Sequence, residues 1–532
     1  MNIRNYNIYF HTHTISGIII SALLYVIFFA GSFAFFKDEI SNWQHNSPNN
    51  TKAKENFDFN ALTDSLDKEH QLYGRDVSYY LDQYSNKINV SISQSKDTTV
   101  VEKKKGRRGK FFYIDIMTQD QKEYKEGYDL GEFLYRLHFF APLNSVGKLG
   151  FPLGYYLAGA VAIMFLFALI TGILVHWEKI ISNFYLFRPW EKIKTIWTDI
   201  HTALGVISFP YLLVFAITGS YFLASSVLFT PPAVQFEYNG NQDSLYKDLG
   251  YGNDEVAFTY LPIDHKADLN AFKNKVKDEW GDEIHITSLE IRNYGDQSML
   301  LEAHGSMPQS KRFTSSGNLV MDMKGNMIKN EHPDRNHTYA EITDNLMYVL
   351  HFGKYGGYAT RILYFVLGIS GCIVIVSGVV IWLTARNKKN IPDRKRKFNR
   401  VLANIYLSMS LSMYPVTALS FIVVKFYPEE GMNFIYRMYF YAWLALTALL
   451  IIRGNNFKTN RDCLLLGSIT GICIPVANGL VTHNWIWISF KNRYHDMLFI
   501  DVFWLFLSLV SFICYVLIVR KHKKEKAALE KV

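Results

Sequence analysis

The chain has 532 residues, of which 49% are hydrophobic, 16% are aromatic and only 19% are charged. Soluble domains carry about 25% charged residues, so this composition argues against an all-soluble enzyme. It also excludes a disordered chain, a coiled coil and a disulfide-rich secreted module. The formal net charge is +9, and its distribution along the chain decides whether it indicates a nucleic-acid partner.

Eight apolar segments are long enough to cross a membrane, which takes about 20 mostly apolar residues. In chain order they are 14–36, 151–177, 203–229, 358–384, 401–424, 434–452, 463–482 and 497–519. The fifth is interrupted by Ser408, Ser410, Ser412 and Pro415, which makes it the weakest of the eight. We therefore predict a membrane-embedded, all-α helical bundle of about eight transmembrane helices.

The basic residues are concentrated beside these segments. The loops at 177–202 and 385–400 and the tail after residue 519 are rich in Lys and Arg. Cytoplasmic loops carry an excess of these residues, so both termini are expected in the cytoplasm. The positive charge then marks the topology, and no nucleic-acid partner is needed to explain it.

Two long polar stretches, 37–137 and 230–350, lie outside the cytoplasm on this topology. Segments 87–93 and 111–117 alternate apolar and polar residues and predict a β-hairpin. In the second stretch, 269–280 predicts a helix, and 284–292 and 298–304 predict strands. We expect two small α+β domains.

The membrane segments contain a repeat. His13 and Gly17 open the first segment, and His201 and Gly205 open the third at the same spacing, with an offset of 188 residues. Glycines four residues after each histidine lie on the same helix face and would let a flat macrocycle approach the backbone.

A second set of repeated motifs supports the duplication. Leu137-His138-Phe139 precedes the second segment and Leu350-His351-Phe352 precedes the fourth. Thr171-Gly172-Ile173 and Ser377-Gly378-Val379 follow near the inner ends of these segments. The first 385 residues therefore form a duplicated four-helix core, and the last four segments are an appended module.

Histidines near a bilayer are candidates for function, because an unpaired imidazole is costly there. On this topology His13, His176 and His201 lie at the cytoplasmic ends of their segments, and His138 and His351 lie at outer ends. Clusters at the two membrane faces are expected of a di-haem electron conduit. Haem iron with two axial imidazoles has no open position, which favours electron transfer over oxygen binding.

A metal site and a proton relay are the competing interpretations. A zinc protease needs a motif such as H-E-x-x-H, which the sequence lacks. A proton-coupled transporter usually has acids in mid-span. The eight segments have none near their centres, and Asp501 is close to an end, which weakens the relay interpretation.

These motifs, taken in order, resemble the PepSY-associated transmembrane helix family, which includes inner-membrane ferric-siderophore reductases. The resemblance covers about residues 8–387. The motifs that carry it are His13-x-x-x-Gly17, Leu137-His138-Phe139, Thr171-Gly172-Ile173-Leu174-Val175-His176, Asn183-Phe184-Tyr185-Leu186-Phe187-Arg188-Pro189, Asp199-Ile200-His201 with Gly205, and Leu350-His351-Phe352-Gly353.

The resemblance implies PepSY-like periplasmic domains on a multi-pass protein of the bacterial inner membrane, with b-type haem held by membrane histidines. The implied ligands are His13, His138, His176, His201 and His351. We expect two haem b groups, with His13 and His201 as one pair and His138 and His351 as the other. His176 would be an alternative ligand or would support one.

The expected activity is that of an oxidoreductase. It would pass electrons from a quinol or a cytoplasmic reductase to a periplasmic ferric siderophore or other ferric chelate, and release iron as Fe(II). Two alternatives remain open. The chain would be an iron-uptake accessory or transport component with ligand-binding domains and no redox activity, or a regulator that restrains a protease.

The expected organisation is a first transmembrane helix at 1–36, a PepSY-like domain at 37–137, two helices within 138–229 joined by the loop 177–202, a second PepSY-like domain at 230–350, a fourth helix at 351–387, a basic loop at 388–400, the C-terminal four-helix module at 401–519 and a basic tail at 520–532.

Overall fold

A computed structural model describes residues 2–98, 109–146, 151–191, 193–225, 229–249, 256–264, 266–388 and 390–529. The chain divides into two compact units. The helical unit comprises Met1–Asn46, Asp129–Pro231 and Ala359–Val532, and the sheet unit comprises Ser47–Tyr128 and Pro232–Tyr358. Each unit is described by itself below.

The helical unit is built from long α-helices joined by short segments. Its elements are α1 (Ile3–Ala34), α2 (Lys37–His45), α5 (Leu130–His138), η1 (Ala141–Ser145), α6 (Leu153–His176), η2 (Trp177–Lys179), α7 (Ile180–Phe184), α8 (Ile193–Ala224), α13 (Gly357–Arg386), α14 (Asp393–Phe426), α15 (Met432–Arg453), α16 (Asn456–Thr482), α17 (Ile486–Lys491) and α18 (His495–Leu529).

Among the described residues, eight helices are long and apolar enough to cross a membrane, which confirms the prediction of a multi-pass membrane protein. They are Ile3–Ala34, Leu153–Ser182, Lys194–Leu223, Lys354–Arg386, Asp393–Phe426, Met432–Arg453, Asn456–Thr482 and His495–Lys524. The fifth segment forms the continuous helix α14, which contains Pro415. In the duplicated core, α6 packs against both α1 and α8.

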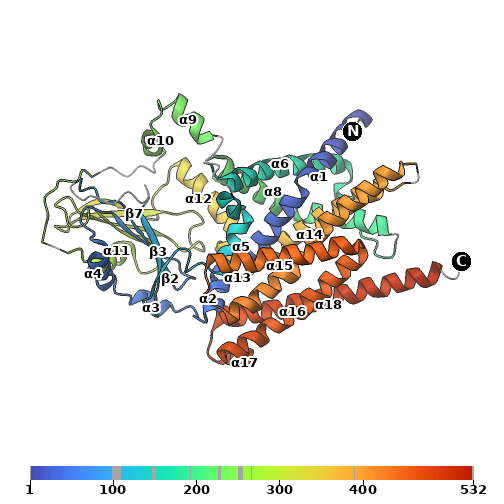
Figure 1. Cartoon of the computed structure of the whole chain (residues 1–532). Helices are drawn as coiled ribbons and strands as arrows, with labels where there is room; N and C mark the ends of the chain where they lie inside the picture. Colours follow the sequence, from blue (N-terminus) through green and yellow to red (C-terminus); the bar gives the residue numbers. More distant parts are fainter. Residues whose placement is uncertain are drawn as a thin grey trace. The chain divides into compact units, whose positions relative to one another are not determined.

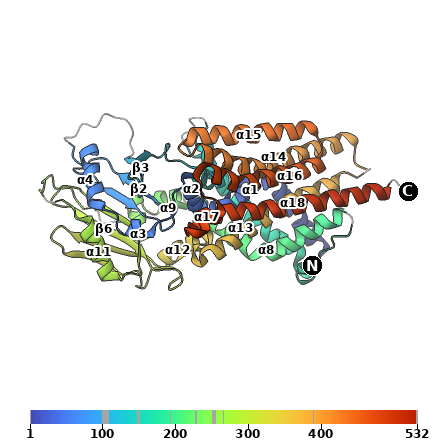
Figure 2. The ribbon, with the colours of Figure 1, turned by 90° about the horizontal axis from the view of Figure 1, so that it is seen from below.

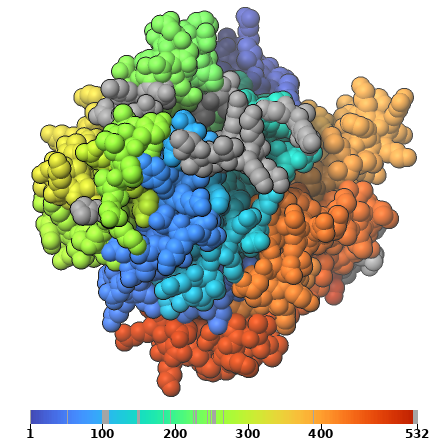
Figure 3. Space-filling view, turned by 60° about the vertical axis from the view of Figure 1, so that its left-hand side comes forward, coloured from blue at the N-terminus to red at the C-terminus, as the bar shows by residue number. Residues whose placement is uncertain are grey.

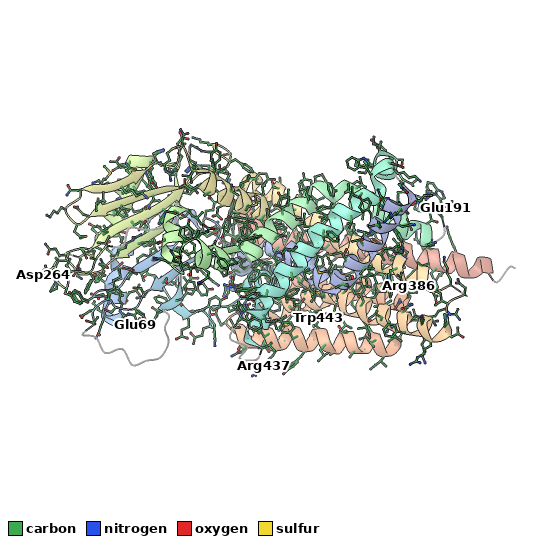
Figure 4. All side chains as sticks on the ribbon, turned by 90° about the horizontal axis from the view of Figure 1, so that it is seen from above. Glu69, Glu191, Asp264, Arg386, Arg437 and Trp443 are labelled. Carbon is green, nitrogen blue, oxygen red and sulfur yellow. The ribbon has the colours of Figure 1, made fainter. Side chains whose placement is uncertain are left out.

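The C-terminal helices form a module of their own. α14 packs against α15 and α16, and α16 packs against α18, so these four helices lie side by side (Figure 1). α1 begins and α18 ends at the same end of the helical unit (Figure 2). Glu191 and Arg386 lie toward this end, and Arg437 lies at the other (Figure 4). We call these the basic end and the far end.

The sheet unit combines strands from both polar stretches. Its elements are α3 (Thr51–Glu55), α4 (Phe59–His70), β1 (Val77–Tyr80), β2 (Lys87–Ile92), β3 (Lys110–Asp115), β4 (Gln121–Glu123), α9 (Thr230–Phe236), α10 (Gln242–Asp248), α11 (Leu269–Trp280), β5 (His285–Arg292), β6 (Leu300–Ser306), β7 (Gly317–Asp322), β8 (Met327–Glu331), α12 (Tyr339–Phe352) and η4 (Lys354–Gly356).

The predicted hairpin at 87–93 and 111–117 is present as the antiparallel pair β2 and β3, and the segment between them at 99–108 lies outside the described residues. The two polar stretches do not form two separate sheets. One described eight-stranded sheet has the order β4-β3-β2-β1-β5-β6-β7-β8, with β1 antiparallel to β5. This joint could not be predicted from the sequence, because strands about 200 residues apart leave no local pattern.

The register of the sheet explains its core. Val77 pairs with Ile92 on one side and with Ile291 on the other, and all three are buried. Alternate residues on successive strands therefore share one face, which packs with apolar residues of α4 and α11 such as Phe59 and Phe272. The two halves of this unit, blue and green to yellow in Figure 3, form neighbouring areas of one surface.

The first turns of α4 and α11 hold each other through reciprocal hydrogen bonds. Asp58 and Asp268 cap the two helices by accepting from backbone N–H groups. The Asn270 side-chain amide donates to Asp58 at 2.7 Å, and that of Asn60 donates to Asp268 at 2.8 Å. The two halves of the unit thus repeat the same Asp-x-Asn cap and exchange its amides.

Candidate functional site

His13 projects from α1 toward α6, near the basic end. Its Nδ1 lies 2.9 Å from the carbonyl oxygen of Ala168. The α6 residue that faces the ring is Gly172, where a Cβ would approach the imidazole to 3.0 Å. A side chain at this position would therefore displace the ring, which explains the glycine in the sequence Thr171-Gly172-Ile173.

His201 repeats this arrangement between α8 and α13. Its Nδ1 lies 2.9 Å from the carbonyl oxygen of Val374 and 3.2 Å from the hydroxyl of Ser377. A Cβ at Gly378 would approach its ring to 3.2 Å. The duplicated sequence motifs thus give duplicated contacts, each a histidine that faces a glycine and bonds to a carbonyl one turn before it.

The two histidines come together in the helical unit. The ring centroids of His13 and His201 are 6.1 Å apart, and the ring planes are inclined by 63°. Ligating histidines commonly donate their second N–H to a carbonyl, which fixes the tautomer and leaves the other nitrogen for the metal. Imidazole–metal bonds are about 2.0–2.1 Å, so a shared metal separates two rings by roughly 6 Å. The distance between the two rings would therefore allow them to hold one metal ion between them.

The space near the pair is open at the two repeated glycines. A Cβ on Gly17 or Gly205 would meet no atom of the described residues within 4 Å. Both positions are one helical turn from their histidine and on the same face. This space, next to paired imidazoles, fits a flat macrocycle that needs close approach to the backbone.

His176 is the last residue of α6 and lies close enough to His13 and His201 for their charges to interact. Of the predicted inner group of three histidines, the structure thus pairs His13 with His201 and places His176 nearby. Within the part of the chain that the structure describes, no group of three or more His, Cys, Asp or Glu side chains is placed to hold a metal ion.

A bidentate ion pair fixes the chain beside His201. The Arg188 guanidinium donates to both carboxylate oxygens of Asp199, at 2.9 Å each, and the Arg188 backbone N–H bonds to the same carboxylate at 3.1 Å. Asp199 is almost fully buried, two residues before His201. Both residues belong to the motifs singled out in the sequence, but their partnership could not be inferred from spacing.

His138 ends α5, a short helix of the helical unit that packs against α1. Its Nδ1 lies 2.7 Å from the carbonyl oxygen of Ile27, and a Cβ at Gly31 would overlap the ring. The contact therefore resembles those of His13 and His201, with a histidine that faces a glycine and bonds to a carbonyl one turn before it.

His351 belongs to the sheet unit, near the end of α12. α12 begins with a capping box, in which the Thr338 hydroxyl accepts from the Glu341 N–H and the Glu341 carboxylate accepts from the Thr338 N–H. His351 lies against Phe352, with ring centroids 5.8 Å apart. Its pairing with His138 stays a prediction.

The sheet unit also contains a pocket of about 420 Å³, built by the β6–β7 connection and one face of α12. Its lining includes His304, Arg312 and Lys354, together with Asn345 and Tyr348. Arg312 pairs with Asp334, and Lys354 pairs with Asp82 at 3.0 Å. Among the described residues, the lining of this pocket includes the cationic side chains of Arg312 and Lys354 and no carboxylate, which suits an anionic ligand.

A buried carboxylate supports one wall of this pocket. Glu302 is fully buried on β6, paired with Arg292 and 3.2 Å from the Nε2 atom of His304. Burial raises the pKa of Glu302, but the hydrogen bond from His304 and the charge of Arg292 outweigh it and lower the pKa below its usual value. His304 is thereby held at the pocket.

Comparison with known proteins identifies the family of the chain. A search of the curated proteins finds no match. The family model described as the PepSY-associated TM region matches residues 10–385, which include His13, His138, His176, His201 and His351. This match covers more than half of the chain and confirms the resemblance drawn from the motifs. The chain belongs to the PepSY-associated transmembrane family.

Proposed function

We propose that the protein is a haem-containing oxidoreductase of the bacterial inner membrane that passes electrons to a periplasmic ferric siderophore or other ferric chelate. The observation that supports this proposal most directly is the His13–His201 pair. Its ring centroids are 6.1 Å apart, and one nitrogen of each ring is fixed by a carbonyl. We propose haem b as the cofactor there and His138, with His351, as candidate ligands of a second haem b.

The protein's own residues would position the cofactor and tune it. Haem supplies reversible one-electron chemistry. The carbonyls of Ala168 and Val374 orient the two imidazoles, and Gly17 and Gly205 leave room for the ring edge. Haem held by His13 and His201 together would favour electron transfer over oxygen binding. The electron donor is external, a quinol or a cytoplasmic reductase.

The substrate chemistry explains how reduction would release iron. Hard oxygen donors hold Fe(III) more tightly than Fe(II), so one electron added to the ferric chelate weakens its hold on the metal. The pocket in the sheet unit is the proposed place for a chelate, because Arg312 and Lys354 in its lining favour negative charge. Iron is the substrate in this reaction, while haem remains with the protein.

The first test is a reduced-minus-oxidised visible spectrum of the full-length protein, purified after expression with sufficient haem. We expect haem b bands, and we expect His13→Ala and His201→Ala to remove the same component. His11→Ala is the matched control, since His11 is exposed on the same helix two residues away. A wild-type protein without haem bands would refute the proposal.

The alternative is an accessory or transport component that binds the chelate without redox activity. The pocket in the sheet unit is the observation that favours it. Binding of a Ga(III) chelate, which resists reduction, to the full-length protein separates the two functions. Binding without haem would support the accessory component, whereas haem with ferric reduction would support the reductase.

A further inference from the structure

The C-terminal module contains polar side chains along the whole length of its central helix. The buried polar residues of α14 are Asn404, Ser408, Ser410, Ser412, Thr417, Ser420 and Lys425. At 1.5 Å per residue, the stretch from 404 to 425 rises about 32 Å, close to the hydrocarbon thickness of about 30 Å. Polar groups are costly at such depth and mark ion or proton pathways in membrane proteins.

Two neighbouring helices contribute to the same interior. On α18, Asp501, Ser508 and Ser511 are buried and follow one another at three- to seven-residue spacing, so they share a face. On α16, the Ser468 hydroxyl donates to the Ser508 carbonyl at 2.9 Å. The Ser511 hydroxyl donates to the Tyr414 hydroxyl of α14 at 3.0 Å. We call this set of side chains the polar lane.

The far end of the polar lane contains a buried aspartate and a buried lysine, which both contact Trp43. The carboxylate of Asp501 accepts from Trp43 Nε1 at 2.9 Å and from the Asn478 amide at 2.8 Å. Lys425 donates to the Trp43 carbonyl and lies 4.3 Å from the centroid of the Trp43 ring. Each of these four residues is at most 1% exposed, and the charges of Lys425 and Asp501 interact.

The polar lane also contains buried hydroxyls that make no hydrogen bond with any other described residue. Ser408 and Ser508 are fully buried, and their side-chain oxygens have no described hydrogen-bond partner. A buried polar group without a partner costs about 1–3 kcal/mol. Packing alone would be served by alanine, so these hydroxyls indicate a role that needs polar atoms, such as hydrogen bonding to water in transit.

We propose that the C-terminal module conducts protons along the polar lane, with the Asp501 carboxylate as the group that takes up and releases the proton at the far end. Each step would move one proton along a hydrogen bond between an oxygen of the polar lane and an intervening water molecule, and no electron, so one proton enters at one end for each that leaves at the other. This function goes beyond electron transfer. An electron and a proton that cross in the same direction leave the membrane potential unchanged.

The test uses the full-length protein in liposomes that enclose a pH-sensitive dye, with a potassium diffusion potential set by valinomycin. We expect faster pH change inside than in protein-free liposomes, and loss of this protein-dependent flux in Asp501→Asn. The control is Asp496→Asn on the same helix, where the acid accepts from Asn42 at 2.9 Å and lies outside the polar lane. Neither haem nor iron is needed, so the result is independent of the reductase proposal.

Smaller changes keep the test decisive if Asp501→Asn fails to fold. Ser408→Ala and Ser508→Ala remove hydroxyls that have no described hydrogen-bond partner, and both variants should lower the flux. Thr470→Ala on α16 is their control, because this hydroxyl is not part of the polar lane and already donates to the Leu466 carbonyl at 2.7 Å. Wild-type flux equal to that of protein-free liposomes, or equal loss in the lane variants and the controls, would overturn the proposal.

Discussion

His13 and His201 each have one ring nitrogen fixed by a carbonyl of the neighbouring helix, and each ring faces a glycine. The sequence showed both histidines and both glycines, because they recur in the same motifs. It could not show which helices pack together, so the carbonyls of Ala168 and Val374 were missed. Backbone atoms carry no sequence signal, and packing alone brings them to a side chain.

At the same scale, the open space beside Gly205 gives a prediction. Gly205→Leu should leave the fold intact, because a Cβ there meets no described atom within 4 Å. If the space receives haem, the variant should lose the haem component that depends on His201. Absorption spectra of the purified variant measure this. Gly219→Ala, on the same helix with an ordinary contact at 3.7 Å, should keep both components.

Among the elements, α12 depends on the charge of its first turn. Burial raises the pKa of Glu341, but hydrogen bonds from Arg335 and Thr338 outweigh it and lower the pKa to about 2. An unfolded Glu titrates near 4.3. The carboxylate therefore stabilises α12 fully above about pH 4.3, and this contribution is lost as the pH falls toward about 2.

Glu341→Gln should then destabilise α12 at neutral pH. This destabilisation should become smaller as the pH falls from about 4.3 to about 2. The ratio of amide hydrogen-exchange rates in α12 between variant and wild type measures the difference at each pH. Thr338→Ala, which removes the other half of the capping box, should cost about 1 kcal/mol. A ratio that stays constant from pH 7 to pH 2 would contradict the assignment.

The helices and strands differ in how far they could be predicted. Long apolar runs predicted all eight spans, since length and hydropathy alone decide membrane insertion. α14 was the weakest of these predictions, because its serines and Pro415 face the interior of the module and not the lipid. α2 was assigned to a polar domain. Its buried face, which includes Glu39 and Trp43, instead belongs to the helical unit.

For the whole molecule, α2 ties the duplicated core to the C-terminal module. Glu39 pairs with Arg361 of α13 at 2.7 Å. Asn42 donates to Asp496 at 2.9 Å, Trp43 donates to Asp501 at 2.9 Å, and the Gln44 amide donates to the Pro428 carbonyl at 2.9 Å. Three of the four partners, Asp496, Asp501 and Pro428, lie outside the family region at 10–385. The module is therefore an integral part of the helical unit.

Removal of residues 393–532 should destabilise the core that remains. The side chains of Asn42, Trp43 and Gln44 would lose their partners, at about 1–3 kcal/mol each when buried. Net stabilities are typically 5–15 kcal/mol, so we expect the truncated chain to aggregate or be degraded. Size-exclusion profiles in detergent measure this, with a chain that lacks only residues 525–532 as the control. A monodisperse truncated protein that retains haem would contradict the prediction.

The joint between β1 and β5 has a consequence for the ancestry of the sheet unit. A protein with one copy of the repeat would present the bare edge of β1 to solvent, and a bare edge pairs with another strand. Its stable form would be a symmetric homodimer, in which β1 of a second copy takes the position that β5 has here. When two copies are joined in one chain, this strand pairing becomes intramolecular and no longer depends on protein concentration. The two edges that remain, β4 with three residues and β8 with five, are short and carry lysine and glutamate, which discourages further strands from joining the sheet.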